Sequence, residues 1–270
     1  MTTRLETAPR GTGVRLRPIL LYLVVAFGLA WAWWGQLILR GVTGPDRLAD
    51  SHLPALLAPA LAALLVRVVQ AGPGGAIALL QSVLRPWQRI GQILGSLVLP
   101  VAAADALWLV AGDAGSVWSY PGIPPGTGVL AILLIALAFN AFGEEVGWRG
   151  FLLAHLAPLG RLRAALLVGL AWALWHAPAF FLPFGLGAHV SGAMILAWAI
   201  SLMAGSVVLA WVWFASGGAL GATILWHLVF NFATATEAMQ GPPAIAASAT
   251  VVAMAVPIAR AWARRPGAAA

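Results

Sequence analysis

The strongest constraint on the fold is a series of long apolar runs. Hydrophobic residues make up 61% of the 270 residues, and charged residues only 9%. A soluble protein of this length cannot bury so much apolar side chain, so the composition predicts an integral membrane protein. Runs of about 20 residues match the hydrocarbon thickness that a helix must cross. We draw eight such spans, at about residues 19–39, 53–69, 90–111, 129–156, 162–182, 193–215, 218–235 and 243–259.

These spans predict an all-α fold, a polytopic membrane bundle of about eight transmembrane helices. A further apolar segment, 76–84, is too short to span and is interpreted as interfacial. We expect a single transmembrane domain at 18–260, with a tail at 1–17 and another at 261–270.

The positions of the arginines predict the topology. All 15 basic residues are arginine, which is typical of a GC-rich bacterial genome. If the N-terminus is cytoplasmic, only Arg40 and Arg47 fall outside and the other arginines fall inside. This bias predicts a multi-pass protein of the bacterial inner membrane with both termini in the cytoplasm.

The net charge also indicates which class of partner to expect. The net charge is +7, but the arginines lie between apolar spans and are best explained by topology and contacts to membrane lipids, not by nucleic acid. The chain has no cysteine, which excludes disulfides and thiolate metal sites.

Glu144 and Glu145 are adjacent within the apolar run 129–156. A carboxylate at bilayer depth costs about 2.5–3.5 kcal/mol on insertion scales, so both need a partner or a chemical task. Glu145 and Arg149 are four residues apart and can pair on one helix face, whereas Glu144 is rotated by about 100°. Gly143 and Gly147 form a GxxxG step that allows close approach of a neighbouring helix.

Two more spans carry polar groups. His176 follows Trp172 by four residues, and Asn231 follows His227 by four, so each pair shares a helix face. A lone histidine or asparagine in such a helix is usually a packing residue bonded to a neighbour. Their joint occurrence with the glutamates indicates a shared polar cavity containing Glu144, His176, His227 and Asn231. This requires the helix that carries Glu144 to continue past Arg149 to about Leu156, with any kink near Gly147 or Gly150.

These motifs resemble those of the CPBP family, the CAAX prenyl endopeptidase and bacteriocin-processing proteins also called Abi, which are intramembrane glutamate proteases. GEEVGWRGFLL resembles the EExxxR motif of the family, WALWH its aromatic-xxx-His motif, and WHLVFN its HxxxN motif. Trp172 departs from the pattern, because the family usually has phenylalanine there.

The resemblance implies an endopeptidase that acts on a membrane-associated or lipidated peptide or protein, without a cofactor. It implies that Glu144 is the general base and that His176 holds and activates water. His227 and Asn231 would stabilise the oxyanion, while Glu145, Arg149 and Trp172 support the site.

Three alternatives stay open. Glu144, His176 and His227 could hold zinc with an open position, although the chain has no HExxH motif. A proton-coupled transporter also places glutamate, arginine and histidine inside its bundle. A non-catalytic immunity protein could keep the same residues without cleaving anything.

Overall fold

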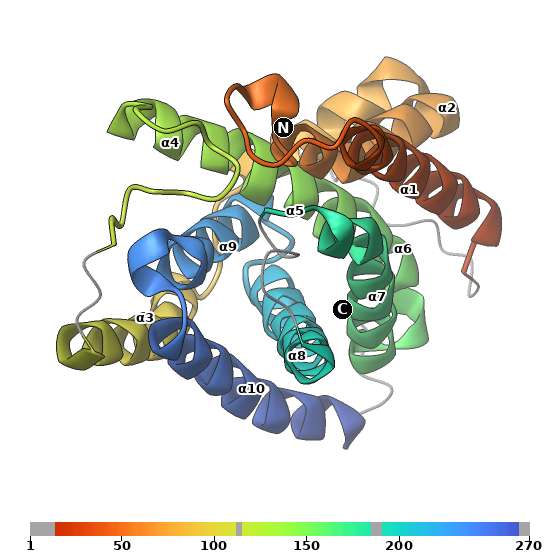
Figure 1. Cartoon of the computed structure of the whole chain (residues 1–270). Helices are drawn as coiled ribbons and strands as arrows, with labels where there is room; N and C mark the ends of the chain where they lie inside the picture. The colour runs from red at the N-terminus through yellow and green to blue at the C-terminus, as the bar shows by residue number, and fades with distance from the viewer. Residues whose placement is uncertain (1–13, 112–114, 185–190, 265–270) are drawn as a thin grey trace.

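The chain folds into a bundle of helices. The computed structural model describes residues 14–111, 115–184 and 191–264, so most of both predicted tails, 1–17 and 261–270, lies outside it. No strand occurs among these residues. Figure 1 shows the helices α1 Leu16–Leu39, α2 Ala58–Gln81, α3 Ile90–Ala111, α4 Val129–Ile135, α5 Gly143–Gly147, α6 Ala154–Leu156, α7 Arg161–Trp175, α8 Gly192–Ala215, α9 Leu220–Ala235 and α10 Pro242–Ala263.

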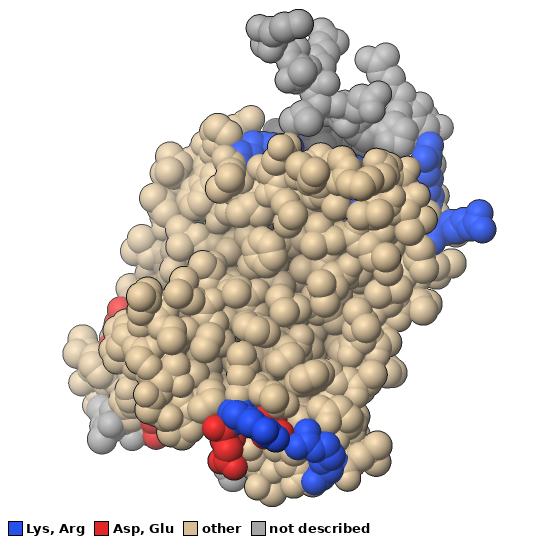
Figure 2. Space-filling model, turned by 90° about the horizontal axis from the view of Figure 1, so that it is seen from above, with Lys and Arg blue, Asp and Glu red and all other residues tan. Residues whose placement is uncertain are grey.

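The helices confirm a polytopic membrane bundle. In the described part of the chain, seven helical stretches are long and apolar enough to cross a membrane, and α9 is a shorter apolar helix of 16 residues. On the face seen in Figure 2, charged side chains gather toward the two ends, and the middle is covered by uncharged residues. An uncharged band between charged ends is what the lipid interior requires.

The helix that carries the two glutamates runs without interruption from Val129 to Leu159. The predicted continuation past Arg149 is therefore confirmed. The helix contains two π-helical segments, Ala136–Phe142 and Trp148–Leu153, on either side of α5. π-Bulges are frequent at functional sites because the wider turn redirects side chains.

The second span differs in detail from the sequence prediction. Helix continues from Leu53 to Leu84, but the backbone is non-helical at Ala71 and Gly72, just before Pro73. Gly72 has a φ of 66°, a conformation that glycine adopts without steric cost. The predicted short segment 76–84 is thus a separate helical piece after this break, and its interfacial location stays a prediction.

Contacts between loops define the two ends of the bundle. At one end, Arg85 donates to the Gly217 carbonyl at 3.1 Å, and the Arg161 guanidinium lies over the Phe214 ring. At the other end, Asp50 pairs with Arg40 at 2.8 Å and with Arg47 at 2.6 Å. The two arginines assigned to the outside therefore both pair with an acidic residue.

Close packing holds the glutamate helix against the start of the second span. α8 lies near the centre of the view in Figure 1, in contact with α7, α9 and α10, while α5 packs on α2. A Cβ added to Gly143 would lie 2.5 Å from the Leu56 carbonyl oxygen, and one added to Gly147 would overlap Pro59. The GxxxG step is therefore a point of close helix approach, as predicted.

Candidate active site

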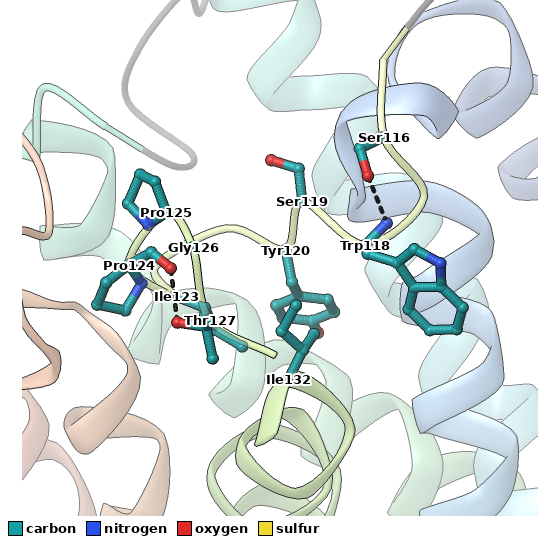
Figure 3. A pocket seen from close by; sticks show the side chains of 10 residues that line it. All are labelled: Ser116, Trp118, Ser119, Tyr120, Ile123, Pro124, Pro125, Gly126, Thr127 and Ile132. Carbon is teal, nitrogen blue, oxygen red and sulfur yellow. Dashed lines mark hydrogen bonds between the residues drawn. The ribbon is translucent and has the colours of Figure 1, made fainter. Parts of the chain in front are cut away.

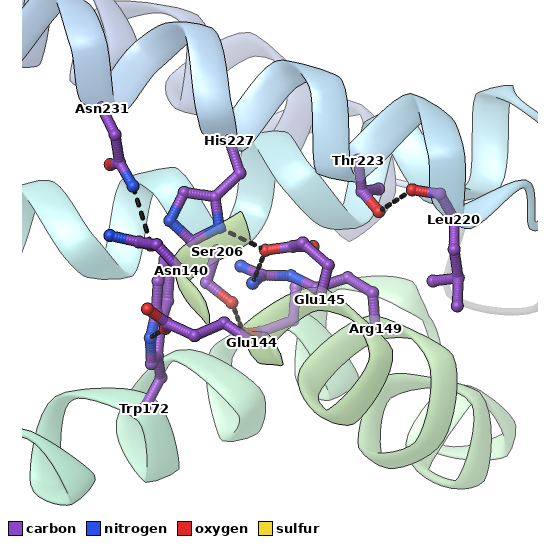
Figure 4. Close-up of polar contacts among 11 residues, drawn as sticks. Asn140, Glu144, Glu145, Arg149, Trp172, Ser206, Leu220, Thr223, His227 and Asn231 are labelled. Carbon is purple, nitrogen blue, oxygen red and sulfur yellow. Dashed lines mark hydrogen bonds and ion pairs between the residues drawn. The ribbon is translucent and has the colours of Figure 1, made fainter. Parts of the chain in front are cut away.

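Glu145 accepts two charge-assisted hydrogen bonds in the interior. Arg149 Nη1 lies 2.6 Å and His227 Nδ1 2.7 Å from the same carboxylate oxygen, Oε1. The side chains of Glu145 and Arg149 are both fully buried. The predicted Glu145–Arg149 pair is confirmed, and His227 from α9 joins it, a contact that the sequence analysis did not foresee. Figure 4 shows these three groups together.

Glu144 points to a different neighbour. It is only 3% exposed, and the indole N–H of Trp172, on α7, donates to Glu144 Oε2. The Arg149 guanidinium lies 4.5 Å from the centroid of the same indole ring, within cation–π range. Trp172 therefore contacts both halves of the EExxxR motif, and Figure 4 shows the two carboxylates turned apart.

His176 lies immediately after the C-terminus of α7. The helix ends at Trp175, and a short 3₁₀ segment, Ala177–Phe181, which includes Pro178, follows. His176 Nδ1 lies 2.8 Å from the Trp172 carbonyl oxygen. The Trp172 ring lies between the two histidines, with centroids 6.1 Å from His176 and 5.5 Å from His227.

Asn231 belongs to a hydrogen-bonded chain of three side chains. Its Nδ2 donates to Asn140 Oδ1 at 2.9 Å, and Asn140 Nδ2 donates to the Tyr120 hydroxyl at 2.9 Å. Asn140 lies four residues before Glu144, in the first π-helical segment. The sequence analysis missed both Asn140 and Tyr120. An asparagine within an apolar span was the available signal for Asn140, whereas Tyr120 lies in a loop that carries no such signal.

The hydroxyl of Tyr120 interacts electrostatically with Glu144. Tyr120 is buried, and burial raises the pKa of its hydroxyl above the ordinary value. The negative charge of Glu144 raises this pKa further, while the side-chain amides of Asn231 and Asn140 lower it. Tyr120 is therefore neutral at physiological pH and close enough to Glu144 to sense its charge.

The expected shared cavity stays a prediction. The side chains of Glu144, His176, His227 and Asn231 come from three helical stretches. Trp172 contacts Glu144, His176 and His227, whereas Asn231 bonds Asn140. A cavity of about 310 Å³ lies beside Tyr120, where it is lined mainly by the loop 116–127 and by Ile132 (Figure 3). Among the described residues, no group of three or more His, Asp or Glu side chains is arranged to hold a metal ion.

The motif residues fall within a segment that matches a known family. No curated protein matched the chain in a sequence comparison. Residues 126–233 match the family model described as type II CAAX prenyl endopeptidase Rce1-like. This segment includes both glutamates, Arg149, His176, His227 and Asn231. Through residues 126–233, the chain is similar to the type II CAAX prenyl endopeptidases of the Rce1-like family.

Proposed function

We propose that this protein is an intramembrane endopeptidase that hydrolyses a peptide bond of a membrane-associated or lipidated substrate with water activated by Glu144. The similarity of residues 126–233 to this family suggests CAAX-type protease activity in the membrane. The observation that carries the glutamate mechanism is the different environment of the two adjacent carboxylates. Glu145 is bound by Arg149 and His227, whereas Glu144 accepts a single hydrogen bond among the described residues, from Trp172.

The charge balance of the cluster supports acid–base chemistry. Glu144, Glu145, Arg149 and His227 are all at most 4% exposed. Arg149 neutralises Glu145, so an ionised Glu144 leaves one negative charge without a counter-charge unless His227 is protonated. A net buried charge is costly, and Glu144 is the carboxylate of this cluster that lacks a dedicated counter-charge. A carboxylate that can gain and lose a proton is what a general base requires.

Hydrogen bonds also assign different roles to the two histidines. A carbonyl oxygen only accepts, so His176 donates from Nδ1 to Trp172 and keeps a lone pair on Nε2 in its neutral form. This nitrogen can hold a water molecule by accepting a hydrogen bond from it. His227 donates from Nδ1 to Glu145, so it can also donate from Nε2 only as the imidazolium.

The reaction then follows in two proton transfers. A water molecule, held by His176, gives a proton to Glu144 as its oxygen bonds to the scissile carbonyl carbon. The carbonyl oxygen becomes an oxyanion, to which Asn231 Nδ2 and His227 Nε2 donate. Glu144 passes the proton to the amide nitrogen as the C–N bond breaks, releasing a carboxyl and an amine product.

The test is cleavage of internally quenched peptides, with and without a farnesyl group, by the protein in proteoliposomes. Glu144→Gln should lower the rate by at least about 100-fold, the contribution of a positioned general base, without changing the melting temperature. Glu237→Gln, at an exposed position in the short 3₁₀ segment Glu237–Met239, is the matched control and should keep the wild-type rate. A Glu144→Gln protein that cleaves normally contradicts the assignment, and loss of solute flux instead of cleavage would favour a transporter.

The zinc alternative needs its own measurement. The metal content of the purified protein, determined by mass spectrometry, should be compared with its activity in chelator. We expect cleavage to persist in chelator. Stoichiometric zinc whose removal abolishes cleavage would instead make Glu144, His176 and His227 ligands.

A further inference from the structure

The two asparagines of this chain meet in the interior. Asn140 and Asn231 are the only asparagines in the sequence, lie 91 residues apart and come from different helices. They nevertheless form a side-chain hydrogen bond of 2.9 Å, and Asn140 extends it to the Tyr120 hydroxyl at 2.9 Å. Figure 4 shows the two amides facing each other beside Glu144 and His227.

This chain of hydrogen bonds determines which way the Asn231 amide faces. The terminal torsion of an asparagine is broad and nearly two-fold, so sequence and backbone alone do not fix its oxygen and nitrogen. Here Asn140 presents Oδ1 to Asn231, because its own Nδ2 is used on Tyr120. Asn231 must therefore turn its Nδ2 toward Asn140. One N–H is used in this bond, and we assign the other to a substrate oxygen.

Packing and a neighbouring backbone hydrogen bond fix the position of Tyr120, the last residue in this chain of hydrogen bonds. It is 4% exposed, and its ring packs against Phe232, on α9, with centroids 5.1 Å apart. The neighbouring Ser119 carbonyl accepts a hydrogen bond of 3.1 Å from the Glu237 amide. The loop that carries Tyr120 is thus attached to the C-terminal end of the helix that carries Asn231. Tyr120 also precedes residue 126, where the family match begins.

We infer that Tyr120 and Asn140 are positioning residues that hold the Asn231 amide with an N–H directed at the oxyanion. The inference rests on the proposed function, which assigns Asn231 as an oxyanion donor. Neither residue touches the reacting atoms, and both act through Asn231. Donation from Asn140 to Tyr120 also polarises the Asn140 amide, which strengthens Oδ1 as the acceptor that holds Asn231.

The kinetic test is a double-mutant cycle. Tyr120→Phe should lower kcat by roughly 3- to 10-fold, the effect of one neutral hydrogen bond, with KM within about 2-fold. Asn231→Ala should lower kcat by roughly 100- to 1,000-fold. In the Asn231→Ala background, Tyr120→Phe should have no further effect on kcat, because the residue through which it acts is gone. Unchanged kcat in the single variant, or the same fold-loss in both backgrounds, overturns the inference.

The other tyrosine supplies the matched control. Tyr22 is fully buried, and its hydroxyl has no hydrogen-bond partner among the described residues. Tyr22→Phe makes the same chemical change outside the chain of bonds and should leave kcat within about 2-fold of wild type. If Tyr120→Phe does not fold, Asn140→Ala replaces it in the cycle with the same expectation.

A spectroscopic test does not depend on cleavage. Labelling with [¹⁵N]asparagine gives only two side-chain amide groups, which Asn140→Ala assigns directly. Tyr120→Phe should shift the amide signals of both Asn140 and Asn231, and Tyr22→Phe should shift neither. An unmoved Asn231 signal overturns the inference even if the enzyme is active. A normal cleavage rate for Glu144→Gln would instead contradict the proposed function. It would not change the expected result of this spectroscopic test.

Discussion

At the scale of single residues, two adjacent glutamates acquire opposite roles because they leave the helix about 100° apart. Glu145 faces Arg149 on its own helix and His227 on α9. Glu144 faces α7, where Trp172 donates to it. Trp172 was expected to act as an aromatic packing residue, but its indole N–H gives it a direct bond to the candidate base.

Trp172→Phe keeps an aromatic ring but removes the donor to Glu144. A hydrogen bond to a charged group contributes about 1.5–3 kcal/mol, so we expect kcat/KM to fall by roughly 10- to 100-fold. Trp226→Phe is the matched control, because that buried indole bonds Ser96 Oγ. The control should lower only the melting temperature. Since the family usually has phenylalanine at position 172, full activity of Trp172→Phe would mean that this bond contributes nothing to catalysis.

Arg149→Ala should lower the stability of the folded protein, and not only its rate of cleavage. It leaves Glu145 buried without its guanidinium partner, and breaking a buried pair from one side costs about 3–5 kcal/mol. We expect poor expression or a clearly lower melting temperature in detergent, measured by intrinsic tryptophan fluorescence. Arg163→Ala, at an exposed position, should change neither. A stable but inactive Arg149→Ala protein would argue that Arg149 contacts the substrate.

At the scale of elements, the helix Val129–Leu159 presents much of the site. It carries Asn140, Glu144, Glu145 and Arg149 within about three turns, and its two π-helical segments flank the glutamates. The helix can lie against residues 56–59 only because positions 143 and 147 have no side chain. Close backbone contact at these positions fixes the depth at which the glutamates sit.

Gly147→Ala tests this contact. The added Cβ would overlap Pro59, and overpacking of this kind costs about 1–3 kcal/mol. We expect a lower melting temperature and a partial loss of activity. Gly35→Ala, on α1, is the control, because nothing lies within 4 Å of its added Cβ. An unchanged melting temperature for Gly147→Ala would show that α2 and α5 can separate freely.

At the scale of the whole molecule, the bundle has two chemically different ends. One end carries Arg85 and Arg161 next to the ends of α8 and α9, and the other has Asp50 paired with both nearby arginines. We propose that the first end faces the cytoplasm, with residues 18–260 forming one domain in the bacterial inner membrane.

Topology can be tested directly because the chain contains no cysteine. Gln240→Cys and Arg264→Cys each introduce one thiol at an exposed position beyond a helix end. In intact cells a membrane-impermeant maleimide should label Gln240→Cys, whereas Arg264→Cys should react only after permeabilisation. The reverse pattern would invert the proposed orientation.

Much of the architecture could be predicted from the sequence because it depends on local rules. Apolar runs of about 20 residues gave the spans, and the i,i+4 spacing gave the Glu145–Arg149 pair. The eight predicted stretches are all helical in the described part of the chain, although α9 is shorter than the other seven. The close approach at Gly143 and Gly147 was also predictable, since small residues four apart leave a groove on one face.

The sequence by itself therefore determined the class of fold, the long glutamate helix and the motif residues, which all follow from periodicity along one chain. Only the tertiary structure decided that His227 bonds Glu145, that the Trp172 indole points at Glu144, and that Asn231 meets Asn140 and Tyr120. These contacts join residues from different helices or from a loop. They depend on side-chain rotamers, helix rotation and relative depth, which are set by packing across the whole bundle.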